Sequence, residues 1–480
     1  MPAAYTTLEI TDNILTADFV DNVNYSLASG GYAPAFPGIR PDEIIGGSSP
    51  YEKVTENIRV NVYGATAAAC LENYYKLGRL LDFADRWRRG DPMVVNPVLF
   101  KIQPQGSNEA DPLVAVIEGR AGTGARLVAS PTFLDELMIW TISNVNVGFV
   151  RRGLLLEQDA TTDTVANSTA NNIAPMSTNF ATIGATHSPI DLVITRSADS
   201  HTVWNGNRGF IVVTKADEDI KIAEIETATR TLGASHSWAT AAIAAASGGT
   251  IGRLTSSATP VSSDVTRFAF VDGTFRPDAR SAVVIASVKN RSNLITWNVA
   301  IENYESGYAG STAQTTVVKI PPGDGITPQF IVLGEFSSPY KITGFDLIVW
   351  AEAPSAAADP HLEFDIVALI AIDTAEARII YTDQAFSLEE GHLRIRGGDA
   401  DPDVYSTQAR LFEFDDSAGS SDALIARPYR GNVYLTCQSN VVVTCLLCGG
   451  ANGWSVMDGN GAKIDLGLTA YRRVGYVTPI

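Results

Sequence analysis

From about residue 188 onward, short apolar runs alternate with turns that are rich in Gly, Pro, Asn and Asp. This pattern is typical of an antiparallel sandwich or jelly roll and argues against a helical bundle. The expected strands are Ile190–Arg196, Arg208–Lys215, Ile220–Thr229, Ser281–Lys289, Ile295–Ile301, Thr315–Ile320, Gln329–Glu335, Phe345–Ala351 and Leu362–Ile372. We therefore expect a jelly-roll or galectin-like β-sandwich over residues 188–384.

The preceding region, residues 51–156, combines a strand, a long helix and a further sheet. Val54 to Tyr63 alternates apolar and polar residues, as in a half-buried strand. Thr66 can cap a helix from about Ala67 to Arg89, because apolar residues recur there every three or four positions. Further strands are expected at Val94–Ile102, Leu113–Glu118, Leu134–Ile142 and Asn146–Leu156. We predict one helix packed on an antiparallel sheet.

Three other segments are harder to place. Residues 1–50 are polar and turn-rich and are expected to form an N-terminal arm. Residues 157–187 are rich in Thr, Ala, Asn and Ser and are expected to be a linker. Residues 385–480 form either a small C-terminal β domain, which we expect, or strands that return to complete the earlier sandwich. The fold class is therefore mainly β, built from antiparallel sandwich domains.

Composition excludes several classes of protein. The 480 residues are 45% apolar and 18% charged, which is incompatible with wholesale disorder. No apolar run reaches the roughly 20 residues of a membrane span. The first basic residue is Arg40, so we expect no signal peptide. A net charge of −18 disfavours duplex nucleic acid as a ligand. We expect neither nucleic acid nor membrane among the partners.

The four cysteines are too few for a disulfide framework in a chain of this length. Cys445 and Cys448 form a C-x-x-C, but a zinc site would need a second pair or histidines at ligand spacing. The favoured interpretation is small buried hydrophobes in a hairpin around Gln438-Ser439-Asn440. A metal or redox role is the alternative.

Motifs for catalysis are missing. The chain has no G-x-S-x-G, H-E-x-x-H or P-loop pattern, and its five histidines are scattered. A glycosidase would need paired carboxylates across a sugar site, which Glu363 and Asp365 could supply from one face of a strand. Acidic β proteins offer such pairs by chance, so we expect no enzyme and keep a glycosidase as an alternative.

A cluster of aspartates provides the weak candidates for a metal site. Asp399, Asp401 and Asp403 resemble the start of a calcium loop. The EF-hand is rejected because Val404 and Arg410 stand where Gly and Glu are required. The favoured interpretation is a solvated turn, so we expect no metal and no cofactor.

Loop aromatics are the candidate glycan contacts. They are Trp204, Trp238, Tyr304 and Tyr308, all of which we place in loops beside Asn, Gly or Ser. An exposed ring can stack on a sugar while polar neighbours supply hydrogen bonds. The alternative is packing or subunit contact. Trp297 and Trp350 lie within expected strands and are assigned to the core.

The layout of strand, helix and sheet resembles tailed-bacteriophage tail proteins of the distal-tail and baseplate-hub type. The stretches that carry the resemblance are Val54–Ala69, Leu71–Leu81, Ala84–Trp87 and Pro97–Phe100, and residues 188–384 resemble the second sandwich of such proteins. The resemblance implies a homo-oligomeric ring, often of six subunits, that joins the tail tube to the tip. It further implies contact with other tail proteins and with host glycans.

We therefore expect a virion structural protein of a phage tail, assembled in the host cytoplasm. Low charge and many sheet edges suit a chain whose edges are covered by neighbours. Two alternatives stay open besides the glycosidase. One is a stand-alone carbohydrate-binding or adhesion protein, and the other is a capsid or decoration subunit.

Overall fold

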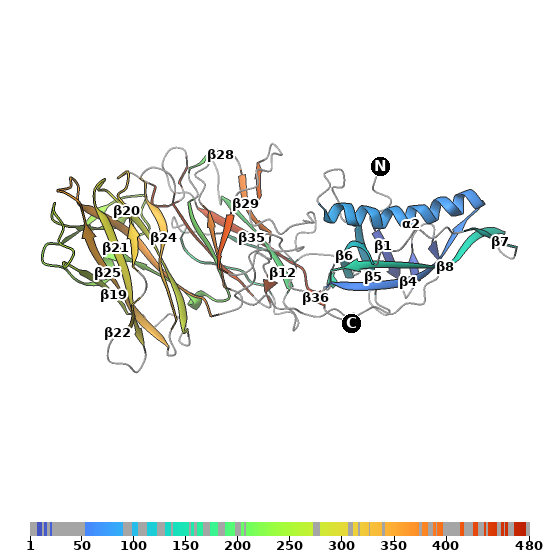
Figure 1. The fold of residues 1–480 in the computed structure, drawn as a ribbon, viewed down its shortest axis with the longest axis horizontal. Coiled ribbons are helices and arrows are strands. Elements are labelled where there is room, and N and C mark those ends of the chain that lie inside the picture. The colour runs from blue at the N-terminus through green and yellow to red at the C-terminus, as the bar shows by residue number, and fades with distance from the viewer. Residues whose placement is uncertain are drawn as a thin grey trace.

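The computed structural model describes residues 7–21, 53–121, 130–166, 173–196, 203–382, 387–396, 413–416, 426–458 and 465–476, with shorter gaps inside these ranges. The chain is elongated, with a helix-on-sheet domain at one end and stacked β-sheets toward the other (Figure 1). Nearly all strand pairs are antiparallel, so the prediction of a mainly β chain built from antiparallel sheets is confirmed. Within the described residues, no helix is both long enough and apolar enough to cross a membrane.

The N-terminal domain is one large sheet, here called the basal sheet. Its central strand order is β2-β1-β5-β6-β8-β4-β3. Its strands are β1 Thr7–Thr11, β2 Ile14–Thr16, β3 Val20–Asp21, β4 Val54–Gly64, β5 Val98–Gln103, β6 Leu113–Arg120, β7 Thr132–Leu134, β8 Ile139–Arg151, β9 Leu155–Glu157 and β36 Gly475–Tyr476. The expected arm therefore contributes strands: β1 runs parallel to β5, and β3 pairs with β4.

The only α-helix among the described residues is α2, Ala67–Arg88, which lies across the basal sheet (Figure 1). The Thr66 side chain accepts a hydrogen bond from the amide of Ala69 and caps its first turn. Its buried residues are Cys70, Leu77, Leu80, Leu81, Ala84 and Trp87. Arg120 of β6 donates to the carbonyl of Gly78 at 2.7 Å and fastens the helix to the sheet. The predicted helix on a sheet is confirmed.

Apart from one small sheet, the remaining described strands form four stacked sheets, numbered here as layers 1 to 4 from the N-terminal domain outward. Layer 1 contains β10 Thr161–Ala166, β12 Ser188–Arg196, β29 Gly391–Arg396, β30 Glu413–Asp416, β32 Thr436–Cys437 and β35 Leu466–Arg472. Layer 2 contains β11 Met176–Ser177, β14 Arg208–Thr214, β27 Arg378–Thr382, β31 Ala426–Arg430 and β33 Val442–Cys448. A small sheet consists of β13 Val203–Asn205, β28 Ser387–Glu389 and β34 Met457–Asp458.

Layers 3 and 4 form an outer sandwich. Layer 3 contains β15 Ile220–Glu224, β17 Ser237–Ala242, β18 Thr250–Thr255, β20 Ser281–Asn290, β24 Gln329–Ser337 and β26 His361–Ala371. Layer 4 contains β16 Thr229–Thr231, β19 Thr266–Val271, β21 Thr296–Glu305, β22 Ser311–Gln314, β23 Val318–Ile320 and β25 Ile342–Glu352. Short 3-10 turns, η2 Asp217–Asp219 and η3 Ile225–Thr227, flank β15.

Three apolar cores hold the layers together. One core lies between layers 1 and 2 and a second between layers 3 and 4. A third core joins layers 2 and 3, with Phe210 and Leu446 on one side and Ile285 and Ile366 on the other. Central strands of the stack are consequently buried on both faces, as in β26 and β33. The sequences of strands buried on both faces are continuous apolar runs, without the alternation of apolar and polar residues seen in half-buried strands.

Because distant strands pair with one another, the domain boundaries in the structure differ from those expected from the sequence. Layer 2 pairs β14 with β33, and layer 1 pairs β12 with β35. The described strands β29 to β33 and β35 therefore complete the sandwich that begins within 157–215, while β36 returns to the basal sheet. The expected separate C-terminal domain is not what these strands form. The expected linker 157–187 contributes β10 and β11. The outer sandwich is an insertion between β14 and β27.

The buried C-x-x-C lies in β33, where every residue is buried. Cys70, Cys445 and Cys448 are free thiols, and burial raises the pKa of Cys445 to about 12. Both cysteines therefore act as small hydrophobes, as the favoured interpretation held. The expected hairpin is wrong, however, because the preceding strand β32 pairs with β12 in layer 1 while β33 pairs with β14.

Candidate functional site

The predicted glycan contact Trp238 does not lie in a loop. It lies in β17, and its half-buried ring packs on Phe268 with ring centroids 5.1 Å apart. The guanidinium of Arg230 lies 5.1 Å from the Trp238 ring centroid. Gly252 leaves room for the indole, since a Cβ there would fall 2.0 Å from the ring. Trp238 therefore closes the end of the outer core, with Arg230 on its ring.

The other predicted contacts divide into two groups. Trp204 lies in β13 and Tyr304 in β21, so both belong to strands instead of loops. Tyr308 lies outside the described residues, as do Asp399, Asp401 and Asp403. Over the described ranges, no three His, Cys, Asp or Glu side chains are grouped so as to hold a metal ion.

A different aromatic, Trp350, lies on a sheet face that none of the other described layers covers. Alternate residues of β25, such as Phe345 and Val349, point into the core between layers 3 and 4. Trp350 and Asp346 therefore point to the outer face of layer 4. Layer 3 is covered by layer 2 over much of its own outer face, so layer 4 is the terminal face of the stack (Figure 1).

Polar side chains surround Trp350 on this outer face. Arg267 of β19 reaches across β25 to Glu302 of β21, with N–O distances of 2.5 and 3.2 Å, and lies 3.6 Å from Asp346. Asn298 stands directly opposite Trp350 on β21. Its side chain is buried, and its amide nitrogen finds no hydrogen-bond partner in the described part of the chain.

The outer face presents the Trp350 ring and the Arg267 guanidinium. The Trp350 indole is half-buried, and the Arg267 side chain, which Glu302 and Asp346 hold in place, is 43% exposed. An apolar ring beside a fixed guanidinium can offer a stacking plane and directed hydrogen bonds. Asn298, Asp346 and Ile348 on the same face are buried. Assignment of Trp350 to the core was wrong. The period-2 pattern gave no clear signal, because Trp350 shares its face with the polar Asp346 and also with the apolar, buried Ile348.

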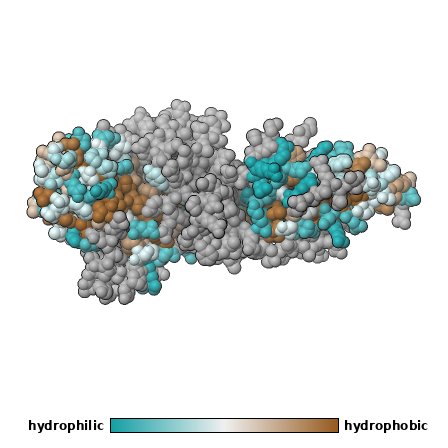
Figure 2. All heavy atoms as spheres, viewed as in Figure 1, coloured by the Kyte–Doolittle hydropathy of each residue, from teal (hydrophilic) through white to brown (hydrophobic). Residues whose placement is uncertain are grey.

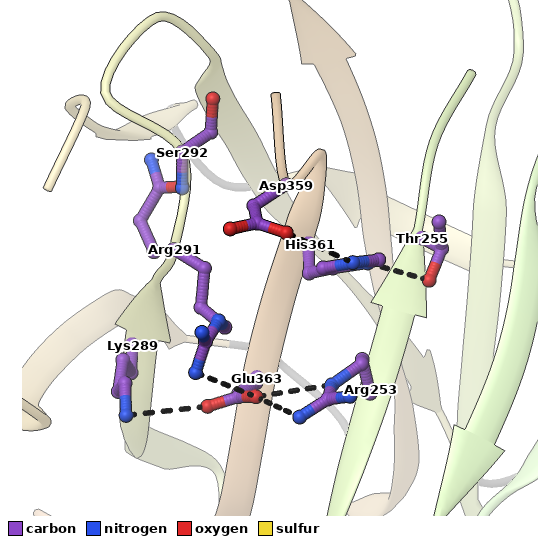
Figure 3. A network of polar contacts seen from close by, with 9 residues as sticks. Arg253, Thr255, Lys289, Arg291, Ser292, Asp359, His361 and Glu363 are labelled. Atoms are coloured by element: carbon purple, nitrogen blue, oxygen red, sulfur yellow. Dashed lines mark hydrogen bonds and ion pairs between the residues drawn. The ribbon is translucent and has the colours of Figure 1, made fainter. Parts of the chain in front are cut away.

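The carboxylate pair proposed for a glycosidase is enclosed. Glu363 of β26 is fully buried and receives Arg253 Nε and Nη2 at 3.0 and 2.6 Å on one oxygen (Figure 3). The Lys289 ammonium lies 3.5 Å from its other oxygen. Asp365 is also fully buried and accepts the amide of Ser247 at 3.1 and 2.9 Å. Neither carboxylate faces a space where a sugar could be protonated or attacked.

An apolar hairpin projects from the N-terminal domain, at the end of the molecule away from layer 4 (Figure 1). It consists of β7 paired with the start of β8. Phe133, Leu134 and Met138 are 38%, 36% and 73% exposed. The Phe133 ring packs on Trp140 with centroids 5.4 Å apart. In Figure 2 apolar surface gathers at this tip. Clustered exposed hydrophobes of this kind mark interaction surfaces.

No family model matches the chain, and no curated protein matches it. Among solved structures, it is similar to a family 22 carbohydrate-binding module from Clostridium thermocellum, with 10% identity, 33% of this chain and 99% of that chain covered, and a TM-score of 0.23. A two-module xylanase structure from the same organism gives 11% identity, coverage of 37% and 30%, and a TM-score of 0.22.

A third similar structure is the enzymatically active domain of tailspike protein 4 from bacteriophage CBA120. It gives 14% identity, coverage of 32% of this chain and 19% of that chain, and a TM-score of 0.22. The match thus spans less than a third of the xylanase and tailspike chains. TM-scores this low carry no functional inference, so the proposals below rest on the residues of this chain.

Proposed function

We propose that this chain is a structural subunit of a phage tail that forms a homo-oligomeric ring through its N-terminal domain and contacts host glycans through layer 4. The observation that carries the proposal is the separation of two unlike surfaces. The apolar β7–β8 hairpin lies at one end of the elongated chain, and the outer face with Trp350 lies at the other (Figure 1). A ring joined at the hairpin end would hold the sandwiches outward.

Residues 1–157 carry 13 basic and 18 acidic side chains, and the rest of the chain carries 22 basic and 35 acidic side chains. Negative charge is therefore spread along the whole chain, and it does not select the surface that meets another copy. The exposed apolar side chains of the hairpin do select one, because clustered exposed hydrophobes are the kind of surface that another protein covers. The occupant proposed for the hairpin is a second copy of this chain.

Polar replacement of the hairpin tests the assembly. We expect the double variant Phe133→Ser with Met138→Ser to shift the protein from oligomer to monomer in light scattering. Each apolar side chain buried in a contact contributes about 1–2 kcal/mol, so the dissociation constant should rise roughly tenfold or more. The matched control is Leu232→Ser with Val261→Ser, two exposed residues of the outer sandwich. Equal effects of both pairs, or a monomeric wild type at every concentration, would refute the proposed ring.

Removal of the indole tests the glycan contact. We expect Trp350→Ala to weaken binding to a neutral polysaccharide about tenfold, since the stacking plane is lost. Affinity electrophoresis on a panel that includes xylan and mixed-linkage β-glucan measures this. Tyr75→Ala removes a 54% exposed aromatic ring of α2 in the N-terminal domain; it is the control and should retain binding. If Trp350→Ala retained full binding, the outer face of layer 4 would be excluded as the glycan-binding surface.

The two remaining alternatives differ in what they predict for the same experiments. A stand-alone carbohydrate-binding protein would be a monomer whose glycan binding depends on Trp350. A capsid or decoration subunit would assemble into a closed shell instead of a ring under electron microscopy. The proposed location is the virion tail, assembled in the host cytoplasm together with other tail proteins.

A further inference from the structure

Cations converge on Glu363 on the polar part of the outer face of layer 3. Arg253 of β18 and Lys289 of β20 are its direct neighbours across the strands. Arg291, just after β20, lies 3.8 Å from the same carboxylate. Figure 3 shows the three cationic side chains directed at the one carboxylate. Three positive charges therefore surround Glu363 in a chain whose net charge is −18, and a second buried carboxylate, Asp365, lies two residues further along β26.

Two exposed carboxylates nearby, Asp359 and Asp324, offset part of this positive charge, and the charge of Asp324 raises the pKa of Lys289. Asp359 is 65% exposed on its side chain and lies 4.0 Å from His361, and Asp324 is exposed as well. Water screens exposed carboxylates far more than buried ones. Burial, followed by the charge of Arg253, lowers the pKa of His361, so its imidazole is neutral at pH 7.

The two arginines still have donors to offer. The Arg291 guanidinium forms no hydrogen bond within the described residues, since its 3.8 Å contact with Glu363 is an ion pair only. Arg253 uses only Nε and Nη2 on Glu363. Their side chains are 35% and 33% exposed, so solvent reaches both. A guanidinium fork of this kind suits a carboxylate or a sulfate.

We propose that Arg291 and Arg253, backed by Lys289, bind the anionic group of an acidic polysaccharide. The inference rests on the proposed glycan contact and adds a second site that selects acidic chains. The acidic surface elsewhere repels a polyanion, so any binding of one must come from a local cluster. Carboxylate and sulfate groups of a polysaccharide share the negative charge that the arginines would recognise. The experiment below tests a carboxylated and a sulfated polymer separately.

The test compares polygalacturonate, dextran sulfate and neutral dextran on the full chain by calorimetry. We expect the acidic polymers to bind and neutral dextran not to bind. Arg291→Gln should weaken binding to them about tenfold, because it removes a charged fork. Arg291→Lys keeps the positive charge and should lose less affinity for the acidic polymers than Arg291→Gln does. Lys341→Gln removes an exposed cation of the same sandwich and should change affinity by less than about twofold.

A small-anion measurement separates this site from the neutral glycan contact. Sulfate or galacturonate should raise the melting temperature of the wild type more than that of Arg291→Gln at matched ionic strength. Equal losses in Arg291→Gln and Lys341→Gln would overturn the proposal as general electrostatics. Equal stabilisation of wild type and Arg291→Gln by the small anions would overturn it too. Neither result depends on Trp350, so the neutral glycan contact would stand.

Discussion

Replacing Glu363 with Ala is expected to destabilise the outer sandwich by about 3–5 kcal/mol, because it removes the buried carboxylate that pairs with both the Lys289 ammonium and the Arg253 guanidinium. The Lys289 side chain is 4% exposed and has little access to compensating water. Burial lowers the pKa of Lys289, while Glu363 raises it. Loss of Glu363 removes the larger of the two charges that raise the pKa of Lys289 and leaves the exposed Asp324 as the other.

Chemical denaturation monitored by tryptophan fluorescence measures this effect. The matched control is Asp359→Asn, which removes an exposed carboxylate of the same cluster while retaining a residue type that tolerates the positive φ of 47°. That variant should change the unfolding free energy by less than about 1 kcal/mol. Sulfate should recover more stability in Glu363→Ala than it adds to wild type. If Glu363→Ala left the free energy of unfolding unchanged, the charges around Glu363 would not contribute to folding.

Phe210→Ala is expected to cost about 3–5 kcal/mol and to uncouple the outer sandwich from layer 2. Phe210 is 3% exposed, lies in the core shared by layers 2 and 3, and packs on Tyr381 with ring centroids 5.1 Å apart. Removal of the ring leaves a cavity between two sheets that each have a second core of their own. The outer sandwich should then melt separately.

Differential scanning calorimetry distinguishes the outcomes. We expect the transition of the stacked layers in the wild type to split into two in Phe210→Ala. Phe133→Ala makes the same replacement at the exposed hairpin. It serves as the control and should leave the transitions of the stacked layers unchanged. A Phe210→Ala variant that keeps a single transition at the wild-type temperature would contradict the shared core between layers 2 and 3.

Local patterns were sufficient for some elements. The alternation of Val54, Ile58, Val60 and Val62 predicts β4, and its burial pattern follows that alternation. The cap at Thr66 and the apolar stripe predict α2 to within one residue. Both signals act over a few residues, where backbone geometry links sequence spacing directly to one face.

Features that depend on contacts between distant strands could not be predicted from local patterns. Continuous apolar runs in β20 and β26 indicate strands buried on both faces, but not which sheet would cover them. The cluster in Figure 3 draws on positions 253, 289 and 363, which only strand pairing brings together. Trp350 was misassigned because a strand pattern does not tell which of its two faces meets a second sheet.

Residue periodicity and helix capping, which are local properties of the chain, predict a mainly β protein with one helix on a sheet at the N-terminal end. Long-range contacts, in contrast, pair β33 and β35 with β14 and β12, more than 200 residues earlier. Tertiary packing likewise decided that four layers stack and that Trp350 lies on the terminal face. Edges and faces of strands are chemically similar along a β chain, so their partners are selected by the burial of whole sheets against one another.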